Sequence, residues 1–475
     1  MVDIRNIEAR KVRPKIGLLP AGHLIYWSQF PGLKEMALNM YHEFRKLLKK
    51  VGDVIAPDLV DTLEKSQQAG RFFRDQDIDI LFVIPLGYNT GMTMIPCVTL
   101  LREDLPIRIL NVHADRSYDY KSADTTIYLY HEGPCCVPEY SAGLVSIGRK
   151  FKVITGPTSS DRVWKEITTD SMGAAAASAF KETNVGIIGD TYIGMVDVPT
   201  DEHRILHATG KLILRPEVEE IEEAFNAVTE KELKDMCAQF REMYDVDKTV
   251  TDEHMTFSAQ AAIAYDKVIH KYDIGPFGYY WWGAKELITQ LRSQSALAVS
   301  RLASMGRPGV TEGDLKTAMA MKIMDFLGAG GMFVEYFALD FDENFLLLGH
   351  DGPANFNVSE GRPVLQHLEV QHGKTGHGLG IDFDVKMGTA TLLNMSQFDA
   401  GETFKLIYTV GEIVPGDILS IGNPNCRFKI AKPIPEFFNE WCQQGPVHHS
   451  SLGIGDISAE IEAFGEAMKF KVVGM

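Results

Sequence analysis

Cysteine is scarce in this chain, and its arrangement argues against two common kinds of site. There are 6 cysteines in 475 residues, and no two of them form a Cys-x-x-Cys pair. Disulfide-rich secreted domains and zinc knuckles both depend on closely spaced cysteine pairs. The sequence therefore predicts neither a disulfide framework nor a sulfur-rich zinc site.

Long apolar runs and an excess of basic residues are also absent. No apolar run approaches the roughly 20 residues that a membrane helix needs, and the polar N-terminus does not resemble a signal peptide. The net charge of -17 disfavours nucleic acid and anionic membranes as partners. We therefore expect a cytoplasmic protein with no nucleic-acid or membrane partner.

Two nucleotide-binding signatures are missing as well. The glycine-rich stretch 328–331 is not followed by the Lys-Ser or Lys-Thr pair that completes a phosphate-binding loop, and no Gly-x-Gly-x-x-Gly fingerprint occurs. We therefore expect no NAD and no other nucleotide cofactor.

Hydrophobic periodicity predicts an α/β protein with a β-rich end. A length of 475 residues is typical of two or three domains. Short apolar runs that alternate with amphipathic ones predict parallel strands and helices in the first part. The strands are expected at 15–19, 78–85, 107–112, 151–155 and 185–188, with a helix at 32–51.

The middle of the chain is more helical, and the last third changes character. Helices are expected at 216–228, 230–244, 251–272 and 285–305. Strands separated by Gly, Asp and Pro turns are expected at 345–348, 364–370, 389–393, 403–410 and 417–421. This pattern predicts two Rossmann-like parallel-sheet α/β domains followed by a C-terminal antiparallel β-barrel-like domain. The expected domains are 1–180, 181–328 and 329–475.

Four side chains at the ends of separate predicted elements could share one metal ion. Glu312, Glu335 and His350 follow one another within forty residues, and His449 lies far downstream beside His448. Mn²⁺ and similar divalent ions prefer carboxylate and imidazole ligands to the sulfur ligands that structural zinc sites use. Glu312 and Glu335 could also carry protons if their surroundings separate their pKa values.

Each of these residues also has a simpler interpretation. Glu312 could stand at a helix start, with Thr311 as N-cap and Asp314 as the acid of a capping box. Glu335 could face solvent through strand alternation, and the two histidines could be ordinary turn residues.

The run Glu-Gly-Asp-x-Lys-Thr-Ala from Glu312 is followed along the chain by Phe-x-Glu, Leu-Gly-His and His-His. These motifs and their order resemble those of the L-arabinose and L-fucose isomerase superfamily, in the arabinose isomerase-like branch. This resemblance implies a metal-dependent aldose–ketose isomerase, an intramolecular oxidoreductase working through an enediol. It also implies Glu312, Glu335, His350 and His449 as Mn²⁺ ligands, with Co²⁺ or Mg²⁺ as alternatives, and the two glutamates as catalytic groups.

The resemblance extends to the sugar pocket and to assembly. The side chains expected to contact substrate are His23, Met195, Phe277, His377 and His448. The family implies a homotrimer or homohexamer with the active site at a subunit interface. The aromatic run from Phe277 and the 135–140 stretch, read as a loop, are the candidate contact regions.

Several positions expected to line the sugar pocket depart from the family pattern. A histidine expected before residue 135 is missing, and His131 lies four residues earlier. Gly22 stands where a glutamine is expected beside His23, and Tyr336 and Phe337 replace an acid and a tyrosine. These changes leave the sugar open, and two alternative functions remain. One is a related metal-dependent epimerase, aldolase or sugar-acid isomerase, and the other is a non-catalytic sugar-binding protein.

Overall fold

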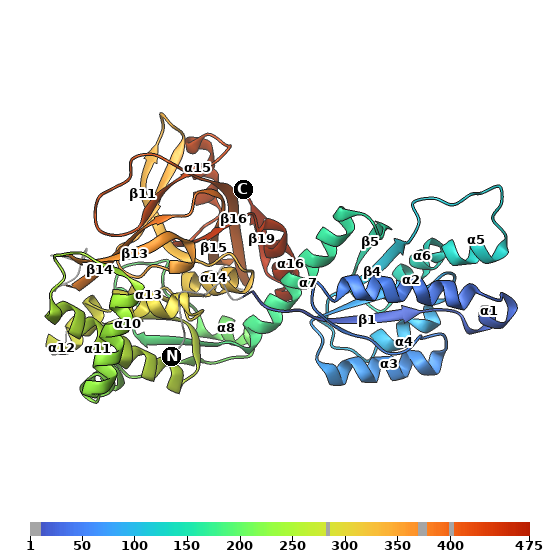
Figure 1. Cartoon of the computed structure of the whole chain (residues 1–475), viewed down its shortest axis with the longest axis horizontal. Coiled ribbons are helices and arrows are strands. Elements are labelled where there is room, and N and C mark those ends of the chain that lie inside the picture. The colour runs from blue at the N-terminus through green and yellow to red at the C-terminus, as the bar shows by residue number, and fades with distance from the viewer. Residues whose placement is uncertain (1–10, 282–285, 369–377, 399–402) are drawn as a thin grey trace. The chain divides into compact units, whose positions relative to one another are not determined.

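The computed structural model describes residues 11–281, 286–368, 378–398 and 403–475 (Figure 1). The chain divides into two compact units, Val12–Ser178 and Ala179–Met475, and Lys11 belongs to the second. Each unit is described by itself.

The first unit is built on a five-stranded parallel sheet of order β2-β1-β3-β4-β5. Its strands are β1 (Lys15–Ala21), β2 (Asp53–Ile55), β3 (Ile80–Pro85), β4 (Ile107–His113) and β5 (Lys152–Pro157). Its helices are α1 (Leu24–Gln29), α2 (Leu33–Leu48), α3 (Leu63–Gln76), α4 (Ile95–Val98), α5 (Thr125–His131), α6 (Gly133–Ser146) and α7 (Asp161–Glu182), the last of which continues into the second unit. This order is that of a doubly wound fold.

Helices cover both faces of this sheet, which explains its continuous apolar strands. All six residues of β3 are buried, as parallel strands covered on both sides require. One core cluster joins the sheet to α3, α4 and α6, through Phe73, Cys97 and Tyr140 among others. A second joins it to α2 and α7, through Phe44 and Ile167. In Figure 1, α2 lies on one side of β1 and α3 on the other.

The second unit begins with another parallel sheet, of order β10-β9-β6-β7. Its strands are β6 (Asn184–Gly189), β7 (Ile213–Leu214), β9 (Ile274–Tyr280) and β10 (Gly309–Val310). The helices of this part are α8 (Glu202–Thr209), α9 (Val218–Asn226), α10 (Glu230–Met243), α11 (Asp252–Lys271), α12 (Glu286–Ser293), α13 (Ala296–Ser304) and α14 (Leu315–Phe326).

The single helix predicted at 285–305 is wrong, because two helices, α12 and α13, occupy its described part. The interruption falls at Ser295. Its hydroxyl donates to the Arg292 carbonyl at 2.8 Å and lies 3.1 Å from the Tyr279 hydroxyl. A serine that hydrogen-bonds nearby backbone competes with helix continuation.

Antiparallel pairing dominates the C-terminal part. A seven-stranded sheet has the order β15-β18-β11-β12-β17-β16-β19, and β15 also pairs with β16. Its strands are β11 (Met332–Asp340), β12 (Phe345–Gly349), β15 (Gly388–Phe398), β16 (Thr403–Val414), β17 (Asn425–Lys429), β18 (Ser450–Ile454) and β19 (Lys471–Gly474). A smaller sheet contains β8 (Asp245–Val246), β13 (Ser359–Leu368) and β14 (Gly378–Val385). Helices α15 (Ile434–Gln443) and α16 (Ser458–Met468) complete this part.

The strand predicted at 417–421 is not formed. The side chain of Asn425 accepts from the Leu419 backbone N–H at 3.0 Å and donates to the Leu419 carbonyl at 2.9 Å. These two bonds satisfy backbone groups that a strand would offer to a neighbouring strand. The apolar run at 417–421 therefore lies in a loop, which the amide side chain of Asn425 holds in place.

The mixed α/β fold with parallel sheets and an antiparallel C-terminal sheet was expected from the sequence, and the structure has it. Within the described ranges, no helix is long and apolar enough to cross a membrane. The three-domain division and the barrel-like form of the last part stay predictions.

Candidate metal centre

Three neighbouring strands bring one carboxylate and two imidazoles to the same level of the C-terminal sheet. Glu335 of β11 pairs with Gly349, the last residue of β12, so His350 follows directly. On the other side of β11, the residue before Glu335 pairs with Ser450, the first residue of β18. His449 immediately precedes Ser450, and it therefore reaches the level of Glu335 from the opposite side. The simpler interpretation of Glu335 as a solvent-facing acid does not fit, because it is partly buried at this junction.

Glu312 comes from a different element, the short 3-10 turn Thr311–Gly313 before α14. Its φ of 65° is left-handed, a conformation that costs a non-glycine residue roughly 1–3 kcal/mol. The N-cap of α14 is Asp314, which accepts from the Thr317 N–H at 3.3 Å. The alternative in which Thr311 caps the helix is therefore wrong: the turn ends before the helix begins, and Glu312 stands outside it.

Close backbone packing holds this turn in place. A Cβ on Gly278 of β9 would lie 2.8 Å from the carbonyl carbon of Gly313, and a Cβ on Gly313 would lie 2.4 Å from the Asp190 carbonyl oxygen. Only glycine fits at both positions. The Tyr192 N–H also donates to the Glu312 carbonyl at 2.9 Å. These contacts around Gly313 and the Glu312 carbonyl hold Glu312 in its left-handed backbone conformation.

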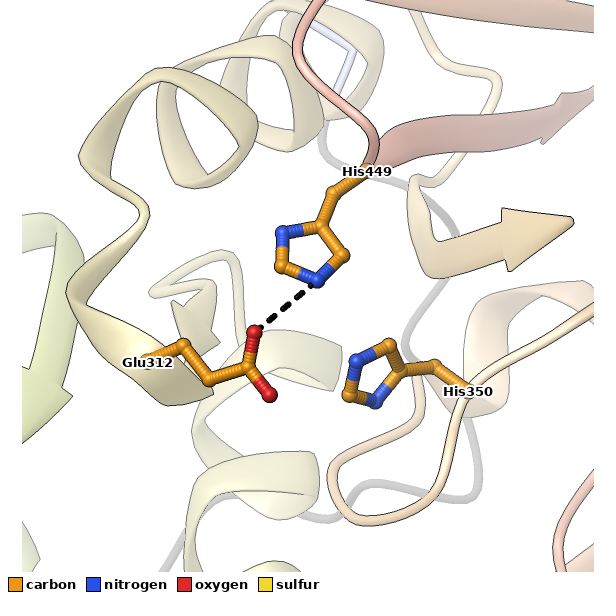
Figure 2. A group of neighbouring side chains, drawn as sticks. All are labelled: Glu312, His350 and His449. Atoms are coloured by element: carbon orange, nitrogen blue, oxygen red, sulfur yellow. Dashed lines mark ion pairs between the residues drawn. The ribbon is translucent and has the colours of Figure 1, made fainter. Parts of the chain in front are cut away.

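The side chains of Glu312, His350 and His449 point toward one another, as Figure 2 shows. One ligand atom from each of these three lies within 4.8 Å of the others, and the same holds for Glu335, His448 and His449. His449 Nε2 lies 3.2 Å from Glu312 Oε2. The four predicted ligands therefore gather in one place, in two overlapping groups that share His449.

Two of the imidazoles are oriented through their Nδ1 atoms. Nδ1 of His350 lies 2.7 Å from the Asp351 carbonyl oxygen, which can only accept. Nδ1 of His449 lies 3.0 Å from Oδ2 of Asp314. An oxygen acceptor at Nδ1 is the usual support of a histidine that binds metal through Nε2. From the sequence, Asp314 was predicted only as the acid of a capping box near a helix start.

Burial and charge shift the pKa values in this cluster. Burial raises the pKa of Glu335 above its ordinary value. Burial alone would lower the pKa of His449, but its hydrogen bonds with Asp314 and Glu312 outweigh this and raise it to about 9. Burial alone would raise the pKa of Asp314, but the hydrogen bond with His449 and the nearby Lys316 hold it low. Glu335 is thus a stronger base than an ordinary carboxylate, which suits proton transfer.

These side chains fit a divalent cation. The donor atoms are carboxylate oxygens and imidazole nitrogens, and their separations approach those of ligands on one ion held at about 2.0–2.2 Å. Such a set suits Mn²⁺, Co²⁺ or Mg²⁺ better than sulfur-seeking metals. Assignment of the ion and of each ligand stays a prediction.

The remaining predicted contacts have different surroundings. His448 lies beside the cluster, with Nε2 3.9 Å from Glu312 Oε2, and Met195 is half-buried in the segment before Asp197. Phe277 is completely buried in the hydrophobic core, because successive residues of β9 are covered on both sides. Its predicted role in binding sugar, and that of its run as an exposed contact region, are at odds with this burial.

His377 and the nearby His372 lie outside the described residues. His23 belongs to the first unit, where its ring contacts those of Tyr26 and Tyr88 at 4.8 and 5.9 Å between centroids. Its proposed contact with substrate stays untested.

The stretch 135–140, expected to be a loop, is helical and belongs to α6. His131, the candidate replacement for the missing histidine, ends α5. Its ring stacks on Tyr118 at 4.4 Å, and its Nε2 lies 3.5 Å from Asp115 Oδ2.

The sequence interpretation did not single out Tyr192, whose backbone N–H donates to the Glu312 carbonyl. Its ring centroid lies 5.0 Å from that of Tyr280 at the end of β9. Tyr280 belongs to the predicted aromatic run, whereas no motif in the sequence marked Tyr192.

Fold and site together define a mixed α/β protein whose candidate active site is a cluster of carboxylates and imidazoles suited to a divalent cation. Two family models match adjoining parts of the chain: the L-arabinose isomerase central domain at residues 207–330 and the L-arabinose isomerase C-terminal domain at residues 330–471. The chain belongs to the arabinose isomerase-like family. All four predicted ligands and His448 lie within the matched residues.

Several named relatives agree with this assignment. An L-arabinose isomerase of Clavibacter sepedonicus is 24% identical over 320 residues, which are 64% of this chain and 62% of the relative. One of Shouchella clausii is 22% identical over 63% of this chain and 62% of its own length. One of Geobacillus thermodenitrificans is 22% identical over 77% of this chain and 75% of its own length. The chain thus spans less than two thirds of the first two relatives.

Proposed function

We propose that this chain is a metal-dependent aldose–ketose isomerase, an intramolecular oxidoreductase acting on a free aldopentose or aldohexose. The observation that carries the proposal is the convergence of Glu312 and Glu335 with two imidazoles, His350 and His449, whose Nδ1 atoms lie against oxygen acceptors. The family assignment supports the same reaction.

Glu312, Glu335, His350 and His449 would hold the ion. Bound there, a divalent cation would polarise the two sugar oxygens and stabilise the negative charge that develops on them.

The two glutamates would move the protons. Isomerisation transfers one proton between neighbouring carbons and one between their oxygens. Glu335, whose pKa burial raises, is suited to remove the proton from carbon and return it to the adjacent carbon through an enediol. Glu312, whose Oε2 lies 3.2 Å from His449 Nε2, would serve the oxygen proton. The partial burial of both carboxylates limits competition from water.

We also propose the architecture that the family implies. Six strands, β15, β18, β11, β12, β17 and β16, are paired in succession and β16 pairs again with β15, which supports a barrel-like C-terminal domain. The domains would be 1–180, 181–328 and 329–475, in a homotrimer or homohexamer with the active site at a subunit interface. A cytoplasmic location remains part of this proposal.

The decisive experiment is a screen of aldoses with the purified chain and added Mn²⁺, read by ketose formation. Turnover of at least one aldopentose or aldohexose is expected. Formation of an epimer or of cleavage products would instead favour an epimerase or an aldolase. Sugar binding without turnover, unchanged by Glu312→Gln and Glu335→Gln, would favour a non-catalytic binding protein.

A further inference from the structure

His448 carries its own carboxylate partner, which the reaction scheme above does not use. Oδ2 of Asp197 lies 2.7 Å from Nδ1 of the His448 ring, and it also accepts the His448 backbone N–H at 2.7 Å. One oxygen therefore fixes both the backbone and the ring of the same residue. The partner comes from a segment 251 positions away in the sequence, so chain proximity does not explain the contact.

This contact determines which ring nitrogen faces the metal centre. An ionised carboxylate only accepts hydrogen bonds, so Nδ1 carries the proton in the neutral ring. Nε2 then presents a lone pair, and it lies on the side of Glu312, 3.9 Å from its Oε2. Burial alone would raise the pKa of Asp197, but its hydrogen bonds with His448 lower it below the ordinary value, which keeps the carboxylate ionised.

The segment that carries Asp197 is fastened on both sides. After Asp197, the buried ammonium of Lys316 donates to the carbonyls of Val198 and Pro199 at 2.7 and 3.0 Å, and to the Thr200 hydroxyl at 3.0 Å. Before it, the segment is tied to the Glu312 carbonyl by a backbone hydrogen bond. Asp197 is therefore held relative to both Glu312 and α14.

The pair is open enough to meet a ligand. The side chains of His448 and Asp197 are 37% and 29% exposed, whereas that of the neighbouring His449 is completely buried. The exposed edge of His448, with Nε2 as acceptor, matches the O–H of a polyhydroxyl substrate.

We propose that Asp197 is a positioning residue that holds His448 in the Nδ1–H form, so that Nε2 accepts a hydrogen bond from a sugar hydroxyl beside Glu312. This inference rests on the proposed isomerase function for the identity of the ligand, although the orientation of the ring does not depend on it.

The test compares Asp197→Asn, Asp197→Ala and Asp197→Glu with Asp201→Asn as a matched control. Asp201 lies four residues further on, where it caps α8 by accepting the His203 N–H at 2.9 Å and pairs with Arg204. The first readout is ¹⁵N NMR of histidine-labelled full chain without paramagnetic metal, with the His448 signals assigned through His448→Gln. We expect the Nδ1–H form in the wild type and in Asp201→Asn, and a mixture of tautomers in Asp197→Ala.

The second readout separates substrate handling from metal binding. In Asp197→Ala, kcat/KM for the best aldose should fall roughly 10–100-fold, the usual effect of losing a group that orients a functional histidine. The Kd for Mn²⁺ should change less than about threefold, since Asp314 still supports His449. Asp197→Glu should recover part of kcat/KM. The isosteric Asp197→Asn keeps the test available if the alanine variant does not fold.

An Nε2–H form of His448 in the wild type, or Asp197 variants that match Asp201→Asn in both readouts, would overturn the inference. If the wild type isomerises no aldose, the proposed function fails by itself, and the NMR result still decides the role of Asp197.

Discussion

Nδ1 of His449 lies 3.0 Å from Oδ2 of Asp314, and both side chains are completely excluded from solvent. The same carboxylate caps α14 by accepting from the N–H and the hydroxyl of Thr317. One residue therefore sets where the helix begins and how the imidazole is turned. Because only Gly313 separates Glu312 from this N-cap, Asp314 helps to position both the turn that carries Glu312 and the His449 ring.

Metal removal should abolish activity. Dialysis against a chelator is expected to stop ketose formation, and Mn²⁺ or Co²⁺ should restore more of it than Mg²⁺, because imidazole nitrogens favour these ions over magnesium. Titration of each ion into the stripped protein, with initial rates as the readout, checks this. Full activity in the presence of chelator would contradict a metal-dependent reaction.

Removing the charge of either glutamate should slow turnover while leaving the fold intact. Glu312→Gln and Glu335→Gln keep the side-chain size and one oxygen, and each should lower kcat by roughly 10²–10⁴, the usual contribution of a general acid or base. Glu343→Gln is a suitable control, because that carboxylate lies on the surface, where it pairs with Arg427. A variant that turns over normally with metal bound would assign its glutamate a structural role alone.

The Asp314–His449 pair should make the metal-free protein lose stability in mild alkali. The pKa of His449 is about 9 in the fold, above the roughly 6.5 of an unperturbed histidine. A raised pKa stabilises the fold fully below about 6.5, and this contribution, on the order of 3 kcal/mol, disappears as the pH rises through about 9. Urea midpoints in chelator between pH 6 and 9 should fall more for the wild type than for Asp314→Asn.

Asparagine caps helices about as well as aspartate, so Asp314→Asn removes the negative charge and keeps the helix cap. Equal pH dependence in the two proteins would show that the pair does not stabilise charged His449.

Assembly should produce a trimer or a pair of trimers, as the family resemblance implies. Large exposed apolar side chains often mark interfaces, and Val145 and Ile147 at the end of α6 are 69% and 40% exposed. Multi-angle light scattering at several concentrations measures the mass directly. A stable and active monomer would refute the assembly prediction.

Substrate choice should depart from a strong preference for L-arabinose. The missing histidine before Cys135, and the changes beside His23 and after Glu335, replace hydrogen-bonding groups expected in the sugar pocket. Pockets that pair a hydroxyl reject analogues strongly, whereas apolar pockets discriminate weakly. Kinetics on L-arabinose, D-galactose, L-fucose and D-arabinose should show a spread below about a hundredfold. A larger advantage for L-arabinose would mean that other groups restore the pocket.

The four side chains predicted as ligands could be singled out from sequence because each stands in or beside an element that has a strong local pattern. Apolar strands such as β11 and β12 are recognisable by themselves; Glu335 interrupts the apolar run of β11, and His350 follows the end of β12. Their convergence was expected only from the family order of the motifs, because no local pattern specifies that β18 pairs with β11.

Other features depend on contacts that no local pattern records. The break at Ser295 requires a hydroxyl to reach a carbonyl in the preceding turn, and the loop at Leu419 requires the amide of Asn425. Phe277 was expected at the sugar pocket, but β9 is covered on both sides and its residues are all buried. The link between Asp197 and His448 joins segments far apart in the chain, so only the folded structure reveals it.

The left-handed backbone at Glu312 has a consequence for how this protein can be changed. Glycine, or to a lesser degree asparagine, would adopt φ near 65° with less strain. Heat resistance and activity therefore make opposite demands on this position, as they commonly do at strained functional sites. A library selected for thermal survival alone would drift toward glycine here and lose the carboxylate. Selection on turnover must accompany selection on stability if the residue is to be kept.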